Sequence, residues 1–127
     1  MGSVCFRVLC VDDESDICDL VELSLGLDSG LSVRTCASGE KAVAIAADWH
    51  PHIIVSDVMM PVMDGPTMLA RLRACPCSAN IPVVFLTASA QLERLESLGA
   101  IGIILKPFDP MTLASSVRRL LGLVPSR

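Results

Sequence analysis

The stretch His52-Ile53-Ile54-Val55-Ser56-Asp57-Val58-Met59-Met60-Pro61 decides the fold. It begins as an apolar, β-branched run, which is typical of a strand buried on both faces of a parallel sheet. The run ends at the carboxylate of Asp57, and Pro61 and the pair Asp64-Gly65 then force the chain to turn. Ligands of open α/β sheets bind outside the carboxyl ends of the strands. Asp57 is therefore either a residue that caps a turn or part of a binding site.

The rest of the chain repeats the pattern of a strand followed by a helix. Besides the strand that ends at Asp57, apolar runs predict strands over residues 5–11, 31–36, 83–87 and 101–105. Helical spacing of apolar residues predicts helices over residues 14–27, 39–49, 66–72, 91–98 and 110–121. Such alternation is typical of a parallel sheet with right-handed crossovers and helices on both faces.

The predicted fold class is α/β: a flavodoxin-like (βα)5 three-layer sandwich around a parallel five-stranded sheet of order 2-1-3-4-5. The second strand alternates apolar and polar residues, so we expect it at an edge. The other four strands are the most apolar, and we expect them to be central. We expect one domain over residues 4–122, followed by a tail or trimmed linker over residues 123–127.

Composition narrows the classes of function. The chain of 127 residues is 52% hydrophobic, with a formal net charge of −4 and an isoelectric point near 5.0. The acidic balance argues against nucleic acid as a direct partner. No apolar run reaches the roughly 18 residues of a membrane span, and the N-terminal residues do not resemble a signal peptide. We therefore expect a cytoplasmic protein without a membrane partner.

The six cysteines favour reduced thiols over a disulfide framework, because four of them lie inside periodic apolar segments. Cys75-Pro76-Cys77 is the only close pair. A structural zinc site needs four ligands, and no second Cys/His pair stands at zinc-ligand spacing. The pair is therefore expected to lie in an ordinary loop.

Polar residues follow four of the predicted strands. Asp12 and Asp13 follow the first, Asp57 ends the third, Thr87 ends the fourth and Lys106 ends the fifth. Each has a purely structural explanation: a helix cap for the acidic pair, a strand end for Thr87 and a solvated charge for Lys106. Because parallel strands share one carboxyl edge, the side chains can instead converge. Three carboxylates would repel unless neutralised, which predicts Mg²⁺, and Lys106 and Thr87 could then bind phosphoryl oxygens.

The same residues, in the same order, resemble the receiver domain of two-component response regulators. The resemblance is carried by Asp12-Asp13, Asp57 with Met60-Pro61 and Asp64-Gly65 after it, Thr87-Ala88, and Lys106-Pro107-Phe108. It extends over nearly the whole chain. It is closest to the single-domain, chemotaxis-type members, because no output domain follows.

The resemblance implies a phosphoacceptor and a metal site. Asp57 would accept a phosphoryl group from a sensor histidine kinase or a phosphotransfer protein. Asp13 would bind Mg²⁺ directly and Asp12 mainly through water, with Asp57 and the backbone carbonyl of Met59 as further ligands.

The resemblance also assigns the residues that bind the phosphoryl oxygens. Lys106 would pair with one oxygen, and Thr87 and the backbone N–H of Ala88 would donate to the others. The Lys106-Pro107 peptide bond would be cis. The output would be a conformational change read by a protein partner, or by a second copy, at the face of the fourth helix, fifth strand and fifth helix.

Two departures from the family pattern stand out. Ile103 replaces the aromatic residue usually found three positions before the lysine, so we expect the switch to work without an aromatic rotamer. The segment after Thr87 is short, which predicts a truncated fourth helix. Its leucines, Leu92, Leu95 and Leu98, either face the core or extend an exposed apolar patch with Ile101 and Ile103.

Other classes of function remain as alternatives. A pseudo-receiver would bind partners without phosphorylation, although the acidic set is complete. A Mg²⁺-dependent aspartyl-phosphate phosphatase would use its nucleophile in an Asp-x-Asp pair after the first strand, where this chain has Asp12-Asp13-Glu14. A flavodoxin-like electron carrier would need a hydroxyl-rich phosphate loop and flanking aromatic residues, and both are missing. We expect no enzyme activity beyond the chain's own phosphoryl transfer and autodephosphorylation.

Overall fold

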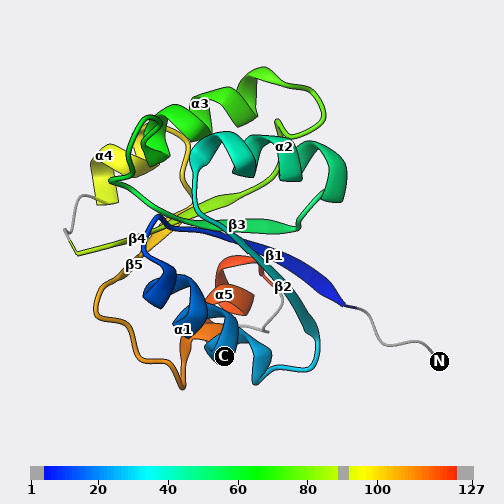
Figure 1. The fold of residues 1–127 in the computed structure, drawn as a ribbon, viewed down its shortest axis with the longest axis vertical. Helices are drawn as coiled ribbons and strands as arrows, with labels where there is room; N and C mark the ends of the chain where they lie inside the picture. The colour runs from blue at the N-terminus through cyan, green and yellow to red at the C-terminus, as the bar shows by residue number, and fades with distance from the viewer. Residues whose placement is uncertain (1–4, 89–91, 123–127) are drawn as a thin grey trace.

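The structure is a computed structural model that describes residues 5–88 and 92–122. One sheet holds five parallel strands in the order β2-β1-β3-β4-β5, as predicted (Figure 1). The strands are β1 (Phe6–Val11), β2 (Leu31–Cys36), β3 (Ile53–Asp57), β4 (Val83–Thr87) and β5 (Gly102–Leu105). The helices are α1 (Ser15–Gly26), α2 (Gly39–Trp49), α3 (Gly65–Ala74), α4 (Leu92–Ser97) and α5 (Leu113–Leu120).

Helices cover both faces of the sheet and make three layers. Figure 1 shows α2, α3 and α4 on one face and α1 and α5 on the other. Each face of the sheet has its own hydrophobic core, and the side chains of β4 alternate between them. Phe85 packs in the core below α2, α3 and α4, whereas Val84 and Leu86 pack in the core below α1 and α5. A strand that is buried on both faces must be apolar throughout, which explains the runs that predicted it.

The prediction that the fifth strand is central was wrong, because β5 lies at an edge next to β4. Ile103 packs against the α2–α3–α4 core and Ile104 packs against the α1–α5 core, so helices partly cover both faces of this strand. The apolar character of β5 therefore reports the covered faces of the strand and not its position in the sheet.

The start of α1 also differs from the prediction. The N-cap is Glu14, which makes no side-chain cap hydrogen bond, and not a residue of the acidic pair. The backbone N–H of Glu14 instead donates to Asp12 Oδ1 over 2.9 Å. The turn before α1 therefore holds one oxygen of the Asp12 carboxylate in place.

The last two helices are short. The described part of α4 is the six residues Leu92–Ser97, and the predicted start at residue 91 lies outside the described residues, so the truncation stays a prediction. α5 begins at Leu113 and not at the predicted residue 110, because Asp109 forms a turn first: its Oδ1 accepts from the N–H of Met111 over 2.9 Å. The predicted tail over residues 123–127 lies outside the described residues.

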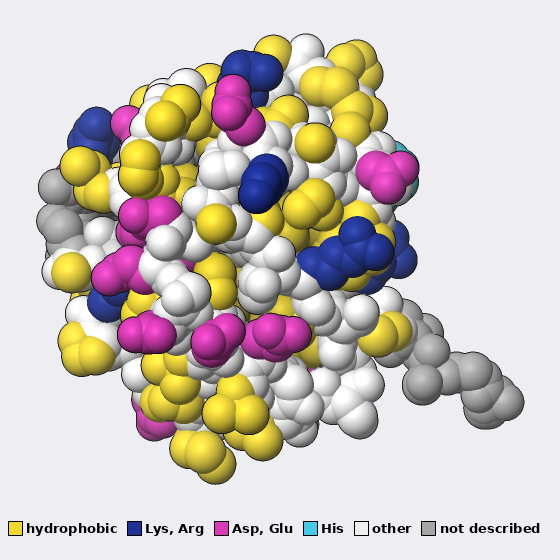
Figure 2. Space-filling view, viewed as in Figure 1, with side chains coloured by type: hydrophobic (Ala, Val, Ile, Leu, Met, Phe, Trp, Pro, Cys, Tyr) yellow, Lys and Arg dark blue, Asp and Glu magenta, His cyan; other side chains and the backbone are white. Residues whose placement is uncertain are grey.

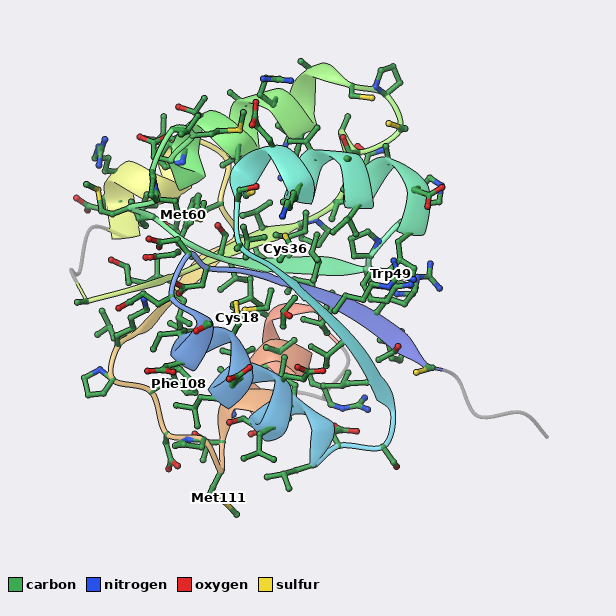
Figure 3. The ribbon with its side chains drawn as sticks, viewed as in Figure 1. Cys18, Cys36, Trp49, Met60, Phe108 and Met111 are labelled. Carbon is green, nitrogen blue, oxygen red and sulfur yellow. The ribbon has the colours of Figure 1, made fainter. Side chains whose placement is uncertain are left out.

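All six cysteines are free. Cys10 and Cys18 are buried among apolar side chains, and Cys18 lies between α1 and the sheet (Figure 3). None of the helices described over residues 5–88 and 92–122 is long and apolar enough to cross a bilayer.

Candidate functional site

The carboxyl ends of β1, β3 and β5 bring three predicted residues together. Lys106 Nζ lies 3.3 Å from Asp12 Oδ2 and 3.5 Å from Asp57 Oδ1. Asp12 is 1% exposed, whereas the side chains of Lys106 and Asp57 are 17% and 13% exposed. A single ammonium group therefore bridges two carboxylates that are largely screened from water.

Asp13 completes a cluster of three carboxylates. One oxygen each of Asp12, Asp13 and Asp57 lies within 4.8 Å of the other two. Asp12 is buried, Asp57 is half-buried and Asp13 is exposed, so the cluster opens to solvent on the Asp13 side. Carboxylate oxygens at this spacing are the hard donors that Mg²⁺ takes in proteins.

The backbone around Asp57 is held from several directions. The N–H of Val58 donates to Asp57 Oδ1 over 2.8 Å, and the N–H of Gly65 donates to the carbonyl of Val58 over 2.8 Å. A Cβ at Gly65 would collide with the ring of Phe85 and lie 2.6 Å from the carbonyl oxygen of Asp57. Only glycine fits so close to the strand end, which is the physical reason for the Asp64-Gly65 pair in the sequence.

The loop between Asp57 and α3 contains a strained residue. Val62 has φ of 68° and is 97% exposed, and the N–H of Met63 donates to the carbonyl of Pro61 over 2.7 Å. A β-branched residue with positive φ is an outlier that the surrounding structure must impose. Here the γ-turn between Pro61 and Met63 imposes it.

Burial and charge perturb two groups of the site. Burial, and then repulsion from Asp12, raise the pKa of Asp57, and the attraction of Lys106 opposes the shift. Burial disfavours the charge on Lys106, but the combined attraction of Asp12 and Asp57 outweighs it and leaves the pKa of Lys106 above its usual range. The cluster thus carries excess negative charge that one lysine does not neutralise fully.

Thr87 and Ala88 border the same edge of the sheet. Thr87 ends β4 and is buried, and its carbonyl accepts from the N–H of Lys106 over 2.8 Å. Ala88 is exposed, and the peptide bond between Lys106 and Pro107 is cis, as predicted. The role of the Met59 carbonyl stays a prediction; the side chain of Met59 is 77% exposed.

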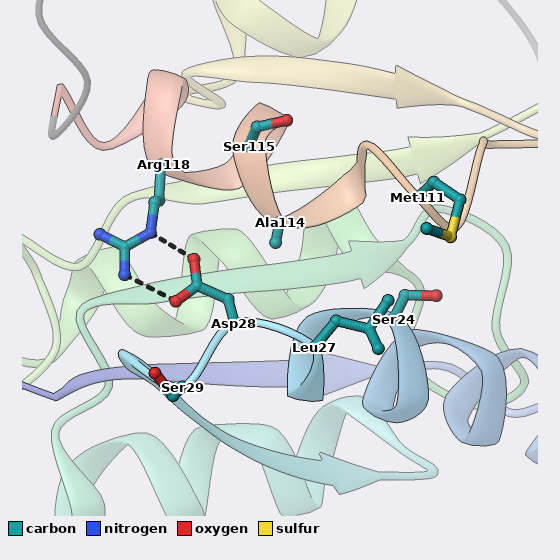
Figure 4. Close-up of a pocket in the computed structure, with 8 residues that line it drawn as sticks. All are labelled: Ser24, Leu27, Asp28, Ser29, Met111, Ala114, Ser115 and Arg118. Atoms are coloured by element: carbon teal, nitrogen blue, oxygen red, sulfur yellow. Dashed lines mark hydrogen bonds and ion pairs between the residues drawn. The ribbon is translucent and has the colours of Figure 1, made fainter.

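Two hollows near α1 had no signal in the sequence. The first, of about 280 Å³, begins beside Lys106 and Ala88 and is otherwise lined by Ile17, Leu20, Pro107 and Phe108. The second, of about 440 Å³, lies between α1 and α5, where Arg118 and Asp28 form an ion pair with Nε 2.5 Å from Oδ2 (Figure 4). Each lining joins residues in or just after α1 to segments much later in the chain, so no local pattern could have revealed them.

The model of the response regulator receiver domain family matches residues 8–118. The chain belongs to this family. Among curated relatives, the receiver domain is 37% identical over 118 residues to the DNA-binding dual master transcriptional regulator RpaA of Synechocystis. The match covers 91% of this chain and 48% of that protein. The receiver domain therefore spans about half the length of this relative.

Solved structures of response regulators and receiver domains have the same fold as this chain. Chemotaxis response regulator CheY4 of Vibrio cholerae superposes with a TM-score of 0.83 at 34% identity, over 92% of this chain and 99% of that one. The receiver domain of sensor histidine kinase PA1611 from Pseudomonas aeruginosa has a TM-score of 0.76 at 26% identity, over 94% of this chain and 99% of that one. The PA1611 structure is described as having a magnesium ion coordinated in the active-site cleft.

The departures from the family pattern are visible in the receiver domain. Ile103 is half-buried against the α2–α3–α4 core. Leu95 is 1% exposed and belongs to that core, whereas Leu98 and Ile101 are 46% and 38% exposed. Leu95 thus faces the core, as the first expectation for these leucines held, whereas Leu98 is exposed, as the second held. The side chain of Leu92 lies outside the described residues.

Proposed function

We propose that this receiver domain accepts a phosphoryl group on Asp57 and transmits the change to a protein partner. The observation that carries the proposal is the contact of Lys106 Nζ with both Asp12 and Asp57, beside the third carboxylate of Asp13. A cation and an acidic cluster at the carboxyl edge of a parallel sheet suit phosphoryl transfer, in which charge neutralisation matters more than acid–base help.

The residues fit a magnesium ion. Asp13, Asp12 and Asp57 would hold it, and the Met59 carbonyl is a further proposed ligand; Asp12 would act mainly through water because Lys106 already pairs with it. When bound, Mg²⁺ would neutralise the carboxylates and the charge that develops on the phosphoryl oxygens. Oxygen-only donors favour this ion over softer metals.

The other residues would act on the phosphoryl group directly. An oxygen of Asp57 forms a bond to phosphorus while the bond from phosphorus to the donor's imidazole nitrogen breaks, and the electron pair stays on that nitrogen. Lys106 binds one phosphoryl oxygen, and Thr87 and the N–H of Ala88 donate to others. We propose no turnover of an external substrate: the chain would act on itself, in its own phosphorylation and hydrolysis.

We propose a sensor histidine kinase or phosphotransfer protein as the donor. For the output, we propose a downstream protein or a second copy at the face of α4, β5 and α5. The exposed side chains of Leu98, Ile101 and Leu105 support this choice, because apolar groups gathered on one surface favour an interface. An aspartyl-phosphate phosphatase is not proposed further, because no feature of the described residues favours it.

We propose that residues 4–122 do not bind nucleic acid themselves. On the side of the molecule that Figure 2 shows, acidic side chains lie in a row, and the exposed acids of α1 are Asp16, Asp19 and Glu22. RpaA is named as DNA-binding, but less than half of RpaA is matched by this chain. We also propose a cytoplasmic location, which the six free cysteines support.

The test is incubation with acetyl phosphate, followed by intact mass measurement. We expect one added phosphoryl group in the presence of Mg²⁺ and a loss of labelling in Asp57→Asn or after chelation of the metal. Asp48→Asn, a change at an exposed aspartate of α2, is the matched control and should label like the unmodified chain. Equal labelling of Asp57→Asn, or none of the unmodified chain, would overturn the proposal.

A further inference from the structure

Cys75 and Cys77 lie in the loop between α3 and β4, and the phosphoacceptor role does not use them. Cys75 is half-exposed and Cys77 is exposed, unlike the buried Cys10 and Cys18. The loop precedes β4 at Val83, whereas the acidic site lies at the other end of that strand. The four steps from Val83 to Thr87 separate the two regions by about 13 Å.

Hydrogen bonds hold the loop in shape without help from the two thiols. Ser78 is 2% exposed, and its hydroxyl donates to the carbonyl of Leu72 over 2.8 Å. The N–H of Ser78 donates to the carbonyl of Cys75 over 3.0 Å, which closes a turn around Pro76. The ring of Pro76 fixes its own φ, so the backbone between the two cysteines has little freedom left. The two thiols are thus presented together on a preorganised turn.

Only one residue separates the two thiols along this turn, and both are at least partly exposed. A hydrogen bond from the Cys77 thiol is the main cause that lowers the pKa of Cys75, and the backbone N–H of Cys77 adds to the effect. The same contact raises the pKa of Cys77. Two neighbouring thiols that both reach solvent, one with a lowered pKa, make a reactive dithiol.

We propose that Cys75 and Cys77 form a two-sulfur chelating site for a soft, low-coordinate centre, the class that includes Cu(I) and trivalent arsenic. Thiolates select soft centres over hard ones. Over residues 5–88 and 92–122, no third His, Cys, Asp or Glu joins the pair at ligand spacing. A tetrahedral zinc site would need two more ligands, whereas a two-coordinate Cu(I) ion, or an organic arsenic centre that brings its own third bond, needs only this pair. The site does not depend on phosphorylation of Asp57.

The probe is phenylarsine oxide, which reacts with two thiols without any transfer of electrons. Two arsenic–sulfur bonds form, the arsenic–oxygen bond breaks, and the two thiol protons leave with the oxygen as water. A dithiol should outcompete single thiols, because the second bond forms at an effective concentration in the millimolar range. The folded protein is treated with one equivalent of the probe, challenged with excess glutathione and weighed intact.

We expect the unmodified chain to retain one phenylarsenic group under this challenge and to release it to dithiothreitol. Cys77→Ser and Cys75→Ser should each retain it about 100-fold less well, because each leaves a single sulfur. Cys5→Ser removes an exposed thiol outside the pair and should retain the group like the unmodified chain. Circular dichroism of each adduct shows whether the fold is intact.

Two results would overturn the inference. Retention by Cys77→Ser equal to that of the unmodified chain would place the arsenic on other sulfur atoms, such as those of Cys10 and Cys18. Loss of the group from the unmodified chain to glutathione as fast as from Cys77→Ser would show that the two sulfur atoms do not chelate. Neither result bears on the phosphorylation of Asp57, which acetyl phosphate tests separately.

Discussion

Replacing Lys106 with Met removes a cation that contacts both Asp12 and Asp57. Met keeps most of the apolar stem, so the change isolates the charge. Asp12 and Asp57 would then face each other and Asp13 with no ammonium between them. We expect the variant to be less stable in metal-free buffer, and Mg²⁺ to restore part of the loss.

The size of the effect follows from the two distances. At 3.3 and 3.5 Å and an effective dielectric constant of about 20, each attraction has a gross energy of about 5 kcal/mol. Burial of the three charged groups offsets most of this sum. Breaking a buried pair by removing one partner typically costs about 3–5 kcal/mol. Because Lys106 keeps 17% of its side chain exposed, we expect a somewhat smaller loss, of about 2–4 kcal/mol.

The assay is urea unfolding at neutral pH, with chelator and then with Mg²⁺. The chain has one other lysine, Lys41, which is exposed on α2, so Lys41→Met is an identical substitution outside the site. We expect Lys41→Met to change stability by less than about 0.5 kcal/mol. The loss in Lys106→Met should shrink as the pH falls through the raised pKa of Asp57, because a protonated carboxyl group no longer repels its neighbours. A Lys106→Met variant as stable as Lys41→Met in chelator would refute the reasoning.

Three substitutions test other parts of the site by urea unfolding. Because burial and Asp12 raise the pKa of Asp57, the folded chain binds that proton more tightly than the unfolded chain, and the ionised group costs stability above the folded pKa. Asp57→Asn should therefore be more stable than the unmodified chain near neutral pH, and the gain should vanish below about pH 4. A stability difference that stays constant across this pH range would contradict a raised pKa of Asp57. Gly65→Ala should lose about 1–3 kcal/mol, since its Cβ would meet the ring of Phe85 and the Asp57 carbonyl, and an unchanged midpoint would count against this close approach. Val62→Gly removes the strain of a β-branched residue with positive φ, about 1–2 kcal/mol, and adds about 0.5–1 kcal/mol of backbone entropy cost. We therefore expect a net gain in stability of about 0.5–1 kcal/mol. A loss of stability would show that φ at Val62 is not strained.

Much of the fold could be predicted because its signals are local. Apolar runs and helical spacing are properties of neighbouring residues, and alternation of strands and helices leaves few topologies. The convergence of Asp12, Asp57 and Lys106 could be predicted once the sheet was inferred to be parallel, because parallel strands share one carboxyl edge. The edge position of β5 agrees with the predicted strand order but not with the expectation drawn from its composition, because apolar composition records how well the faces of a strand are covered and not how many neighbours it has.

Features that depend on distant residues could not be predicted. The ion pair between Arg118 and Asp28 joins residues 90 positions apart. The positive φ of Val62 depends on how the loop closes between Asp57 and α3, and nothing in the residue type signals it. Asp12 has both of the roles offered for it, because its Oδ2 contacts Lys106 while its Oδ1 holds the N–H of Glu14 at the start of α1.

The most direct test of the central claim asks which carboxylate carries the phosphoryl group. Asp12, Asp13 and Asp57 have oxygens within 4.8 Å of one another, so labelling alone does not identify the nucleophile. Borohydride reduces an aspartyl phosphate to homoserine, and peptide mass mapping then locates the changed residue. We predict homoserine at position 57 after incubation with acetyl phosphate and Mg²⁺. Homoserine at position 12 or 13, or unchanged aspartate at all three positions, would contradict the account.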